Sequence, residues 1–463
     1  MNLSDEALSR AAGAFLIPGN RIKLLKDAAE NYPAWIAAIE SAEKWIHFET
    51  FIIHEDEMGW KFAELFAEKA RQGVKVRLVY DWAGALGNTS HRFWRHMAEH
   101  GIDVRCFNPP RIDSPLGWIN RDHRKMIGVD GRLAFITGLC VGQRWVGYPE
   151  RGIDAWRDTG VEIEGPAVYE VERAFAEVWD VSGSPLPGVE TPRADTIAEA
   201  GDVNIRVVDT VPNRGRIYRV DQLITTMARR SIWLSDAYFI GTSSYVQALA
   251  AAASSGVDVR LLIPGASDVP IARALARAGL RPLLEAGVRV FEWNGSMMHA
   301  KTAVADGQWA RVGSTNLNLT SWLGNWELDV IVEDERFARK MENMYEDDLT
   351  QATEIVLGRR RRRAVVVARG APRRARKTVG GRTTRAAAGV MRISNAVGAA
   401  MTNHRTLGPA EAVIMLWGAA ILALFSVLAF IWPKAIAYPL VVFSMWLAIS
   451  LLVRGVKLRR RRG

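Results

Sequence analysis

The sequence predicts an α/β protein built from two pseudo-twofold-related lobes, followed by a C-terminal transmembrane helical hairpin. Three observations predict this fold class: an internal repeat, an alternation of helical patterns with short apolar strands inside each repeat, and two long uncharged runs near the C-terminus. At 463 residues, the chain is long enough to build two hydrophobic cores.

The internal repeat consists of four blocks that recur in the same order at similar spacing. The matched segments are Trp45–Phe51 with Trp233–Phe239, Gly73–Val79 with Gly256–Leu262, Gly101–Arg105 with Gly287–Phe291, and His123–Gly142 with His299–Asn318. One such match means little by itself, but four in register indicate a duplicated lobe.

Within each repeat, helical segments alternate with strand-like runs. The clearest helix–strand pairs are 62–71 with 74–80, and 245–253 with 257–263. Gly73 and Gly256 stand where each helix should end. This alternation is typical of an α/β lobe with a largely parallel or mixed sheet.

Composition sets the predicted domain boundaries. Glycine and proline cluster between residues 183 and 202, which separates the two lobes. The predicted parts are a first lobe (1–190), a second lobe (200–357), a basic flexible arm (358–410), a transmembrane hairpin (411–454) and a basic cytoplasmic tail (455–463).

The net charge of +10 is unevenly divided along the chain. From Gly358 onward there are 21 Lys and Arg and one acid, Glu411, so this part carries +20 and the first 357 residues carry −10. A nucleic-acid-binding surface should be basic where the chemistry occurs, so we expect no nucleic-acid partner. The basic arm favours an anionic membrane surface, and a solvated tether is the alternative.

Two runs near the C-terminus, 412–432 and 435–453, contain no charged residue. A helix of 21 residues rises about 30 Å, which matches the hydrocarbon core of a bilayer. Only Pro433 and Lys434 separate the runs, which predicts a tight hairpin, and basic residues flank both outer ends, which places these ends in the cytoplasm. A buried hairpin of a soluble domain is the alternative.

The N-terminal residues show no signal peptide, and there are two cysteines, Cys106 and Cys140. Two cysteines form neither a disulfide framework nor a Cys-x-x-Cys metal site. The sequence therefore favours a reducing compartment for the two lobes.

The residues that carry chemistry form a His-x-Lys-x4-Asp pattern at the same place in both repeats. The two copies are His123, Lys125 and Asp130, and His299, Lys301 and Asp306. Alternate residues of an extended segment face the same side, so each His and Lys should project together. A twofold arrangement of the lobes would bring both pairs into one cleft, whereas two satisfied core histidines are the alternative.

Such a set suits a phosphodiester substrate. One imidazole attacks phosphorus and the other protonates the leaving alkoxide. The lysines, with small donors such as Ser314 and Asn316, would stabilise the negative oxygens. Because cationic side chains do this, the chemistry requires no metal and no cofactor. Asp158 and Glu327 stand at comparable positions in the two repeats and are candidates to orient the imidazoles.

The doubled motif resembles the phospholipase D superfamily, and the chain is most similar to bacterial cardiolipin synthases. The resemblance covers about residues 17–345, including the runs Pro18–Leu25 and Phe48–Ile53. It implies two phospholipase D-like lobes and a phosphohistidine intermediate, with His123 as the nucleophile. It also implies that Asp130 and Asp306 anchor loops.

The resemblance further implies that a phosphatidyl group passes from one phosphatidylglycerol to another, releasing glycerol and making cardiolipin. The expected location is the bacterial inner membrane, as a multi-pass protein with a cytoplasmic catalytic region. The chain departs from the family at Thr137-Gly-Leu-Cys140, where Gly-Gly-x-Asn is usual, and in having its apolar runs at the C-terminal side. The alternatives are a phospholipase D-type hydrolase of phospholipids, a nuclease and an inactive membrane scaffold.

Overall fold

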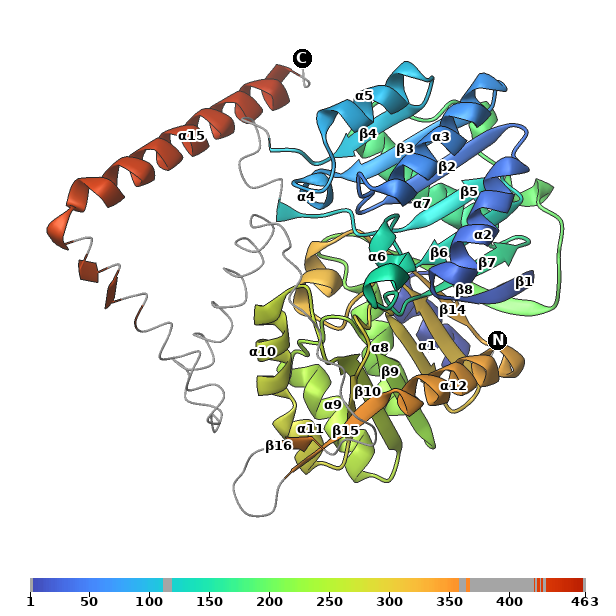
Figure 1. The fold of residues 1–463 in the computed structure, drawn as a ribbon, viewed down its shortest axis with the longest axis vertical. Coiled ribbons are helices and arrows are strands. Elements are labelled where there is room, and N and C mark those ends of the chain that lie inside the picture. Colours follow the sequence, from blue (N-terminus) through green and yellow to red (C-terminus); the bar gives the residue numbers. More distant parts are fainter. Residues whose placement is uncertain are drawn as a thin grey trace. The chain divides into compact units, whose positions relative to one another are not determined.

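A computed structural model describes residues 3–110, 119–357, 364–366 and 430–460, together with isolated positions between 420 and 427 (Figure 1). The chain divides into two compact units, residues 1–107 with 121–381, and residues 108–120 with 382–463. Both His-x-Lys-x4-Asp motifs lie in the first unit.

The first unit contains two lobes whose strands follow one another in the same order. The first lobe holds β1 (Ile17–Lys26), β2 (Trp45–Thr50), β3 (Lys75–Asp81), β4 (Asp103–Phe107), β5 (Met126–Val129), β6 (Leu133–Thr137) and β7 (Thr159–Glu164). The second holds β8 (Val203–Thr210), β9 (Ser231–Ser235), β10 (Asp258–Pro264), β11 (Arg289–Trp293), β12 (Thr302–Ala305), β13 (Trp309–Gly313), β14 (Glu327–Val332), β15 (Ala352–Leu357) and β16 (Ala364–Val366).

Strand order makes the duplication visible. Across the described residues the strands form one continuous sheet of 16, in which β1 and β8 pair at the centre. From there the first lobe runs β1-β7-β6-β5-β2-β3-β4 and the second runs β8-β14-β13-β12-β9-β10-β11. In both lobes the last three strands are parallel and their other pairings are antiparallel. The predicted pair of α/β lobes with mixed sheets is therefore confirmed.

Helices cover the sheet in an equally repeated way. Those of the first lobe are α2 (Asp27–Glu40), α3 (Glu57–Arg71), α4 (Trp82–Ala85), α5 (His91–Glu99), α6 (Gln143–Val146) and α7 (Val168–Ser182). Those that pack on the second are α1 (Leu3–Ala12), α8 (Arg216–Met227), α9 (Ser243–Ser254), α10 (Pro270–Gly279), α11 (Arg281–Glu285) and α12 (Glu335–Thr350). A π-helical turn, η5 (Thr320–Gly324), follows β13 as α6 follows β6.

The predicted helix–strand pairs appear as α3 with β3 and α9 with β10. Asp56 caps α3, accepting the N–H of Gly59 at 3.1 Å. After both helices the chain turns through a left-handed glycine, Gly73 with φ 90° and Gly256 with φ 95°. This local chemistry was readable in the sequence because only glycine adopts that conformation without strain.

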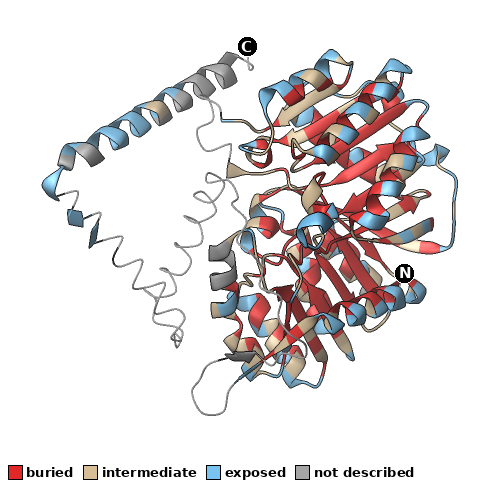
Figure 2. Ribbon diagram, in the orientation of Figure 1, coloured by how far each residue is buried: buried red, intermediate tan, exposed pale blue. Residues whose placement is uncertain are grey.

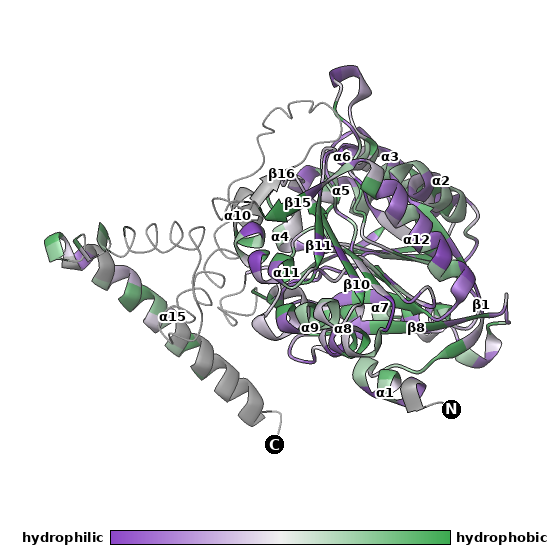
Figure 3. Ribbon diagram, turned by 90° about the horizontal axis from the view of Figure 1, so that it is seen from below, coloured by the Kyte–Doolittle hydropathy of each residue, from purple (hydrophilic) through white to green (hydrophobic). Residues whose placement is uncertain are grey.

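Three hydrophobic clusters hold the first unit together. One lies between α2, α3, α5 and the first sheet, and a second between α1, α8, α9, α11 and the second sheet. The third joins the lobes, since Ile136 and Val161 of the first lobe lie in the same cluster as Val312 and Val330 of the second, with α7 and α12 included. The strands are mostly buried (Figure 2), and many of their residues are hydrophobic (Figure 3). The shared cluster fixes the two motifs in one rigid frame.

The structure corrects the register of the first repeat block. Trp45 pairs with Lys75 and Ser231 pairs with Asp258, so the structural counterpart of Trp45 is Ser231, two residues before Trp233. Trp233 instead takes the place of His47. Consistent with this, His47 stacks on a ring of α7 and Trp233 stacks on a ring of α12.

The prediction of a C-terminal hairpin is not supported by the described residues. The second apolar run, 435–453, lies inside α15 (Pro433–Arg460), one helix that continues through Pro439. None of the helices in the described part of the chain is long and apolar enough to cross a membrane. The first run, 412–432, and the arm, 358–410, lie largely outside the described residues, although β16 of the arm pairs with β15.

Candidate active site

Just before its strand begins, each motif pairs through its backbone with a segment of the other lobe. The backbone N–H of His123 donates to the carbonyl of Trp326 at 2.9 Å, and the N–H of Trp326 donates to Arg121 at 2.8 Å. In the second half, the N–H of His299 donates to Arg157 at 2.7 Å. These bridges place the start of β5 beside the start of β14, and the start of β12 beside the start of β7.

The bridges produce crossed histidine–acid pairs. Nδ1 of His123 lies 2.9 Å from Oε2 of Glu327, and Nδ1 of His299 lies 2.6 Å from Oδ2 of Asp158. Each acid immediately precedes or begins the strand that carries it, and each comes from the lobe opposite its histidine. Because Nδ1 of His123 is bound to a carboxylate, Nε2 is the nitrogen of that ring left for a substrate. Nε2 of His299 lies 3.1 Å from Nζ of Lys301. The sequence had not indicated which acid would face which histidine.

Burial is the largest cause of the pKa shift of both imidazoles. It lowers the pKa of His123 to about 4, against the opposing carboxylate of Glu327. Burial also lowers the pKa of His299, and the Lys301 ammonium lowers it further. Near neutral pH the ring of His123 is therefore uncharged, which is the state a nucleophile needs.

The two acids are held in the charged form. Burial alone would raise the pKa of Asp158, but His299 and Lys301 lower it to about 2. Burial would raise the pKa of Glu327 too, but His123, Lys125 and the Ser314 hydroxyl together lower it. Each dyad thus contains a carboxylate that is ready to stabilise an imidazolium.

The lysines lie beside the histidines, as their spacing predicted. Lys125 donates to the carbonyl of His123, and Lys301 donates to the carbonyl of His299. Burial, with a smaller contribution from Lys125, lowers the pKa of Lys301 to about 8 against the opposing effect of Asp158. Lys301 also lowers the pKa of His123, and Lys125 that of His299, so each motif lies within the electrostatic field of the other. The two motifs therefore form one cationic site.

Asp130 and Asp306 lie at the far ends of β5 and β12 and bind backbone instead of the imidazoles. Asp130 accepts the N–H groups of Glu43, Lys44 and Trp45, each at 2.8 Å. Asp306 accepts the N–H groups of residues 229, 230 and 231 at 2.9, 2.7 and 2.9 Å. Both adopt positive φ, 54° and 53°, a conformation that Asp tolerates better than most residues. This geometry fits the anchoring role that the resemblance implies.

The prediction for Ser314 needs revision. Its hydroxyl donates to Oε2 of Glu327 at 2.6 Å and accepts the N–H of Leu328 at 2.9 Å, so it is not free to donate to a phosphate. Ser314 holds an acid instead. Asn316 is 4% exposed, and within the described residues Oδ1 of its amide has no hydrogen-bond partner. That oxygen can only accept a hydrogen bond, so any contact with a phosphate would come from the NH2 group of the same amide.

The rest of the site is aromatic and differs between the halves. Phe51 lies edge-on to His123 with ring centroids 5.1 Å apart. Trp145, Trp156 and Tyr238 surround His299 at 5.7, 5.5 and 6.1 Å. None of these four rings was predicted from the sequence as a site residue. Trp145 lies in α6, and the other three lie outside the named helices and strands.

The departure at Thr137–Cys140 leaves the local turn intact. Thr137 accepts the N–H of Leu139 at 3.0 Å through its hydroxyl, and the carbonyl of Cys140 accepts the Tyr32 hydroxyl at 2.7 Å. By the repeat, Cys140 takes the place that Asn316 holds in the second half. The site therefore has an amide on one side and a thiol on the other.

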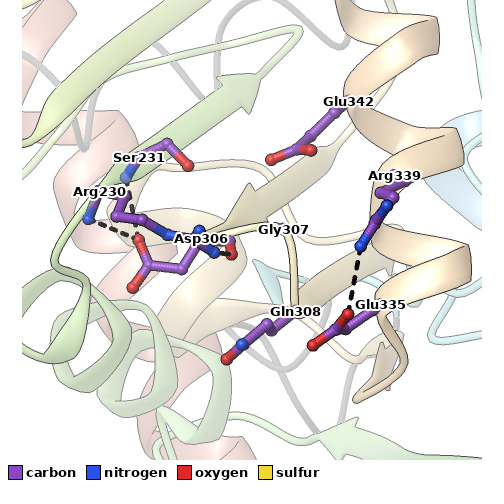
Figure 4. A pocket seen from close by; sticks show the side chains of 8 residues that line it. All are labelled: Arg230, Ser231, Asp306, Gly307, Gln308, Glu335, Arg339 and Glu342. Carbon is purple, nitrogen blue, oxygen red and sulfur yellow. Dashed lines mark hydrogen bonds and ion pairs between the residues drawn. The ribbon is translucent and has the colours of Figure 1, made fainter.

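A cavity of about 390 Å³ lies at the other end of β12, away from the imidazoles (Figure 4). It is lined by Arg230, Ser231, Asp306, Gly307, Gln308, Glu335, Arg339 and Glu342. Asp306 reaches it only as a loop anchor, since three backbone N–H groups already occupy its carboxylate. Among the described residues, no group of three or more His, Cys, Asp or Glu side chains is placed to hold a metal ion.

Comparison with known proteins agrees with this geometry. A family model described as cardiolipin synthase, PLD-like domain, matches residues 35–179 and 222–349, one segment in each lobe. The chain belongs to this family. A probable cardiolipin synthase, YwiE, of Bacillus subtilis is 31% identical over 75% of this chain and 69% of its own length. A cardiolipin synthase of Listeria welshimeri is 30% identical over 74% of this chain and 72% of its own length.

A solved structure supports the fold alone. The phosphatidylserine synthase of Haemophilus influenzae Rd KW20 superimposes with a TM-score of 0.60 at 15% identity, covering 76% of this chain and 92% of that one. The two-lobed architecture with phospholipase D-like halves is therefore shared with a protein of distant sequence. The cardiolipin synthase family assignment rests on the sequence matches in both lobes.

Proposed function

We propose that the protein is a phosphatidyltransferase that makes cardiolipin from phosphatidylglycerol through a phosphohistidine intermediate. Family membership supports the substrate and the reaction class. The observation that carries the mechanism is the crossed pairing, which holds His123 and His299 by Nδ1 against an acid of the opposite lobe. We propose that a bound phosphate takes Nε2 of His123 and draws the Lys301 ammonium away from Nε2 of His299.

In the first step, Nε2 of His123 attacks the phosphorus of a phosphatidylglycerol. A nitrogen–phosphorus bond forms, and the bond from phosphorus to the head-group glycerol oxygen breaks. His299 gives its proton to that oxygen, and free glycerol leaves. The low pKa of His123 fits a nucleophile, because its ring is neutral before attack. His299 begins this step as an imidazolium, which Asp158 stabilises against the lowering of its pKa by burial and Lys301.

In the second step, a primary hydroxyl of a second phosphatidylglycerol attacks the phosphohistidine. His299 takes the hydroxyl proton, the nitrogen–phosphorus bond breaks and cardiolipin forms. Glu327 and Asp158 stabilise the imidazolium of their partner ring in turn. The cycle returns both histidines to their starting state and consumes no water, metal or cofactor.

The two lysines stabilise the charge that builds on the phosphoryl oxygens. Each ammonium is positioned by the carbonyl of its own histidine. That of Lys301 also lies 2.9 and 3.1 Å from the two ring nitrogens of His299, a contact that it would exchange for the phosphate. Asn316 completes this set as a proposed donor from the second half. Asp130 and Asp306 contribute by fixing the loops at the distal ends of β5 and β12.

The proposal places the reaction at the cytoplasmic face of a bacterial cell membrane. The charge of +20 from Gly358 onward supports attraction to anionic lipid, since each basic residue near such a surface adds about 1 kcal/mol. Extraction of cell membranes with alkaline carbonate tests the predicted multi-pass anchor. Retention of the protein in the pellet supports the anchor, whereas release supports surface binding alone.

The test of function uses purified full-length protein and phosphatidylglycerol labelled in the head group, in mixed micelles. We expect cardiolipin and free glycerol in equal amounts. Phosphatidic acid in place of cardiolipin would assign the chain to the hydrolases, because water would then be the acceptor. Absence of all three products would overturn the proposal.

A further inference from the structure

We propose that Trp145 is a positioning residue for the transfer reaction and acts on His299 through Asp158. This inference rests on the proposed function. Nε1 of Trp145 donates to Oδ2 of Asp158 at 3.1 Å, and that same oxygen lies 2.6 Å from Nδ1 of His299. One carboxylate oxygen is therefore shared between an indole and the imidazole.

The indole is held firmly enough to position its neighbours. Trp145 is 2% exposed, and its ring meets His299 edge-on at 5.7 Å and 84°. A second ring, Trp156, packs 5.0 Å away. The other oxygen of Asp158 accepts the backbone N–H of Thr159 at 2.9 Å, so the carboxylate is held at both ends. A buried carboxylate with these donors has little freedom to rotate away from the imidazole.

In the second half of the molecule, a different side chain donates to the oxygen of the acid that binds the histidine. Oε2 of Glu327 accepts a hydrogen bond from the Ser314 hydroxyl instead of from an indole N–H. The corresponding turn, η5, also carries a tryptophan, Trp322, but its Nε1 donates to Asp221 at 3.2 Å. Space explains part of the difference, because a Cβ at Gly138, the counterpart of Ser314, would lie 2.2 Å from Oδ1 of Asp158. Trp145 thus supplies a donor that a serine has no room to supply.

A hydrogen bond donated to the carboxylate of Asp158 weakens its electrostatic stabilisation of the His299 imidazolium. The N–H group stabilises the negative charge of Asp158, so the imidazolium of His299 is stabilised less than by an unshared carboxylate. Removal of the indole N–H should raise the pKa of His299 and let the carboxylate turn. The other charged groups facing this dyad are Lys301, Lys125, Arg157 and Asp27, which accepts the backbone N–H of Asp158 at 2.8 Å. The ring of His54 lies 6.0 Å from that of Trp145.

The test compares Trp145→Phe with wild type in cardiolipin formation across pH. We expect kcat to fall about tenfold, the effect of losing one hydrogen bond to a charged group, with KM unchanged. We also expect the limb of the pH–rate profile that reports His299 to move to higher pH. In an Asp158→Asn background the same substitution should leave the profile unmoved, because its route of action is gone.

The matched control is Trp322→Phe, which removes a buried indole N–H in the corresponding turn. It should lower thermal stability to a similar extent and leave the pH profile in place. A profile that is identical in wild type and Trp145→Phe, or additive effects of Trp145→Phe and Asp158→Asn, would overturn the inference. Wild-type protein that makes no cardiolipin would count against the proposed function instead.

A second measurement needs no substitution at Trp145. Indole N–H resonances of protein labelled with ¹⁵N-tryptophan are followed against pH in wild type and in Asp158→Asn. We expect one indole resonance to titrate together with the His299 limb in wild type and to lose that titration in Asp158→Asn. Absence of such a resonance would overturn the inference even if Trp145→Phe did not fold.

Discussion

Oδ2 of Asp158, in the first lobe, lies 2.6 Å from Nδ1 of His299, in the second. Glu327 and His123 repeat this relationship in the opposite direction at 2.9 Å. Neither lobe therefore holds a complete histidine–acid pair by itself. A displacement of one lobe against the other would break both pairs at once. A hydrophobic cluster with members from both lobes opposes such a displacement.

Replacement of either histidine should abolish turnover without unfolding the protein. We expect His123→Ala and His299→Ala each to lower cardiolipin formation by at least about 1,000-fold, because each removes a nucleophile or a proton donor. The readouts are product formation from labelled phosphatidylglycerol and the thermal unfolding midpoint. Full activity in either variant would mean a different mechanism.

Asp158→Asn and Glu327→Gln should impair catalysis with little change in substrate binding. Each amide keeps the shape of the acid but cannot stabilise an imidazolium, so we expect kcat to fall by about 100-fold or more. Asp154→Asn is a suitable control, since Asp154 is an exposed acid of the same lobe. Comparable losses in the control and in Asp158→Asn would show that the crossed pairs carry no special role.

The lowered pKa of His123 predicts activity at unusually low pH. The free ring is neutral down to about pH 4, so the acid limb of kcat/KM, which reports loss of the neutral His123 ring, should lie near pH 4. The same lowered pKa makes the stability of the fold depend on pH. Because the folded pKa lies under the unfolded value of about 6.5, protonation favours the unfolded chain, and stability is lost as pH falls from 6.5 towards 4.

That prediction is checked with initial rates at constant ionic strength. A return of the enzyme from pH 5 to pH 7 controls for acid unfolding and should restore full activity. An acid limb centred near 6.5 would show that the ring of His123 is fully solvated in the working enzyme, contrary to its 12% exposed side chain.

The anchor aspartates should matter for stability more than for chemistry. Asp130→Asn removes a charged acceptor of three backbone N–H groups, and we expect a loss of about 2–4 kcal/mol in the free energy of unfolding. Asp130→Ala should cost more, since Ala tolerates positive φ less well than Asn. Folded Asp130→Asn should keep activity within about tenfold of wild type, measured beside urea unfolding; a complete loss in stable protein would assign Asp130 a direct chemical role.

Much of the site was readable from sequence because its parts are local. The two motifs, their extended approach and the glycine turns at Gly73 and Gly256 depend on neighbouring residues, and the repeat showed that they occur twice. The crossing of the acids was not readable, because it depends on bridges such as that between Asp122 and Trp326, which join segments about 200 residues apart.

Two sequence-based predictions were wrong, one about the alignment of the repeats and one about the role of a serine. Trp45 and Trp233 are the same residue but occupy positions two apart in the sheet, because register follows hydrogen bonding and not residue type. Ser314 has the right chemistry for a phosphate ligand, yet its hydroxyl belongs to Glu327. Trp145 carried no motif, and only the fold brings its indole to Asp158.

The basic segment after Gly358 should bind anionic membranes. We expect replacement of the arginines at 359–363 by glutamine, in the full-length chain, to weaken sedimentation with phosphatidylglycerol vesicles by at least about tenfold at low salt. Neutral phosphatidylcholine vesicles should bind neither protein strongly. Equal binding of both proteins to anionic vesicles would show that these arginines are a tether only.

The most direct test of the composite site is to trap the covalent intermediate. Protein mixed with phosphatidylglycerol labelled at phosphorus is quenched within one turnover, digested and mapped. The crossed geometry predicts up to one phosphoryl group per chain, on the peptide that contains His123, and none in His123→Ala. Label spread equally over His123 and His299, or found on neither, would contradict a single site with two distinct imidazoles.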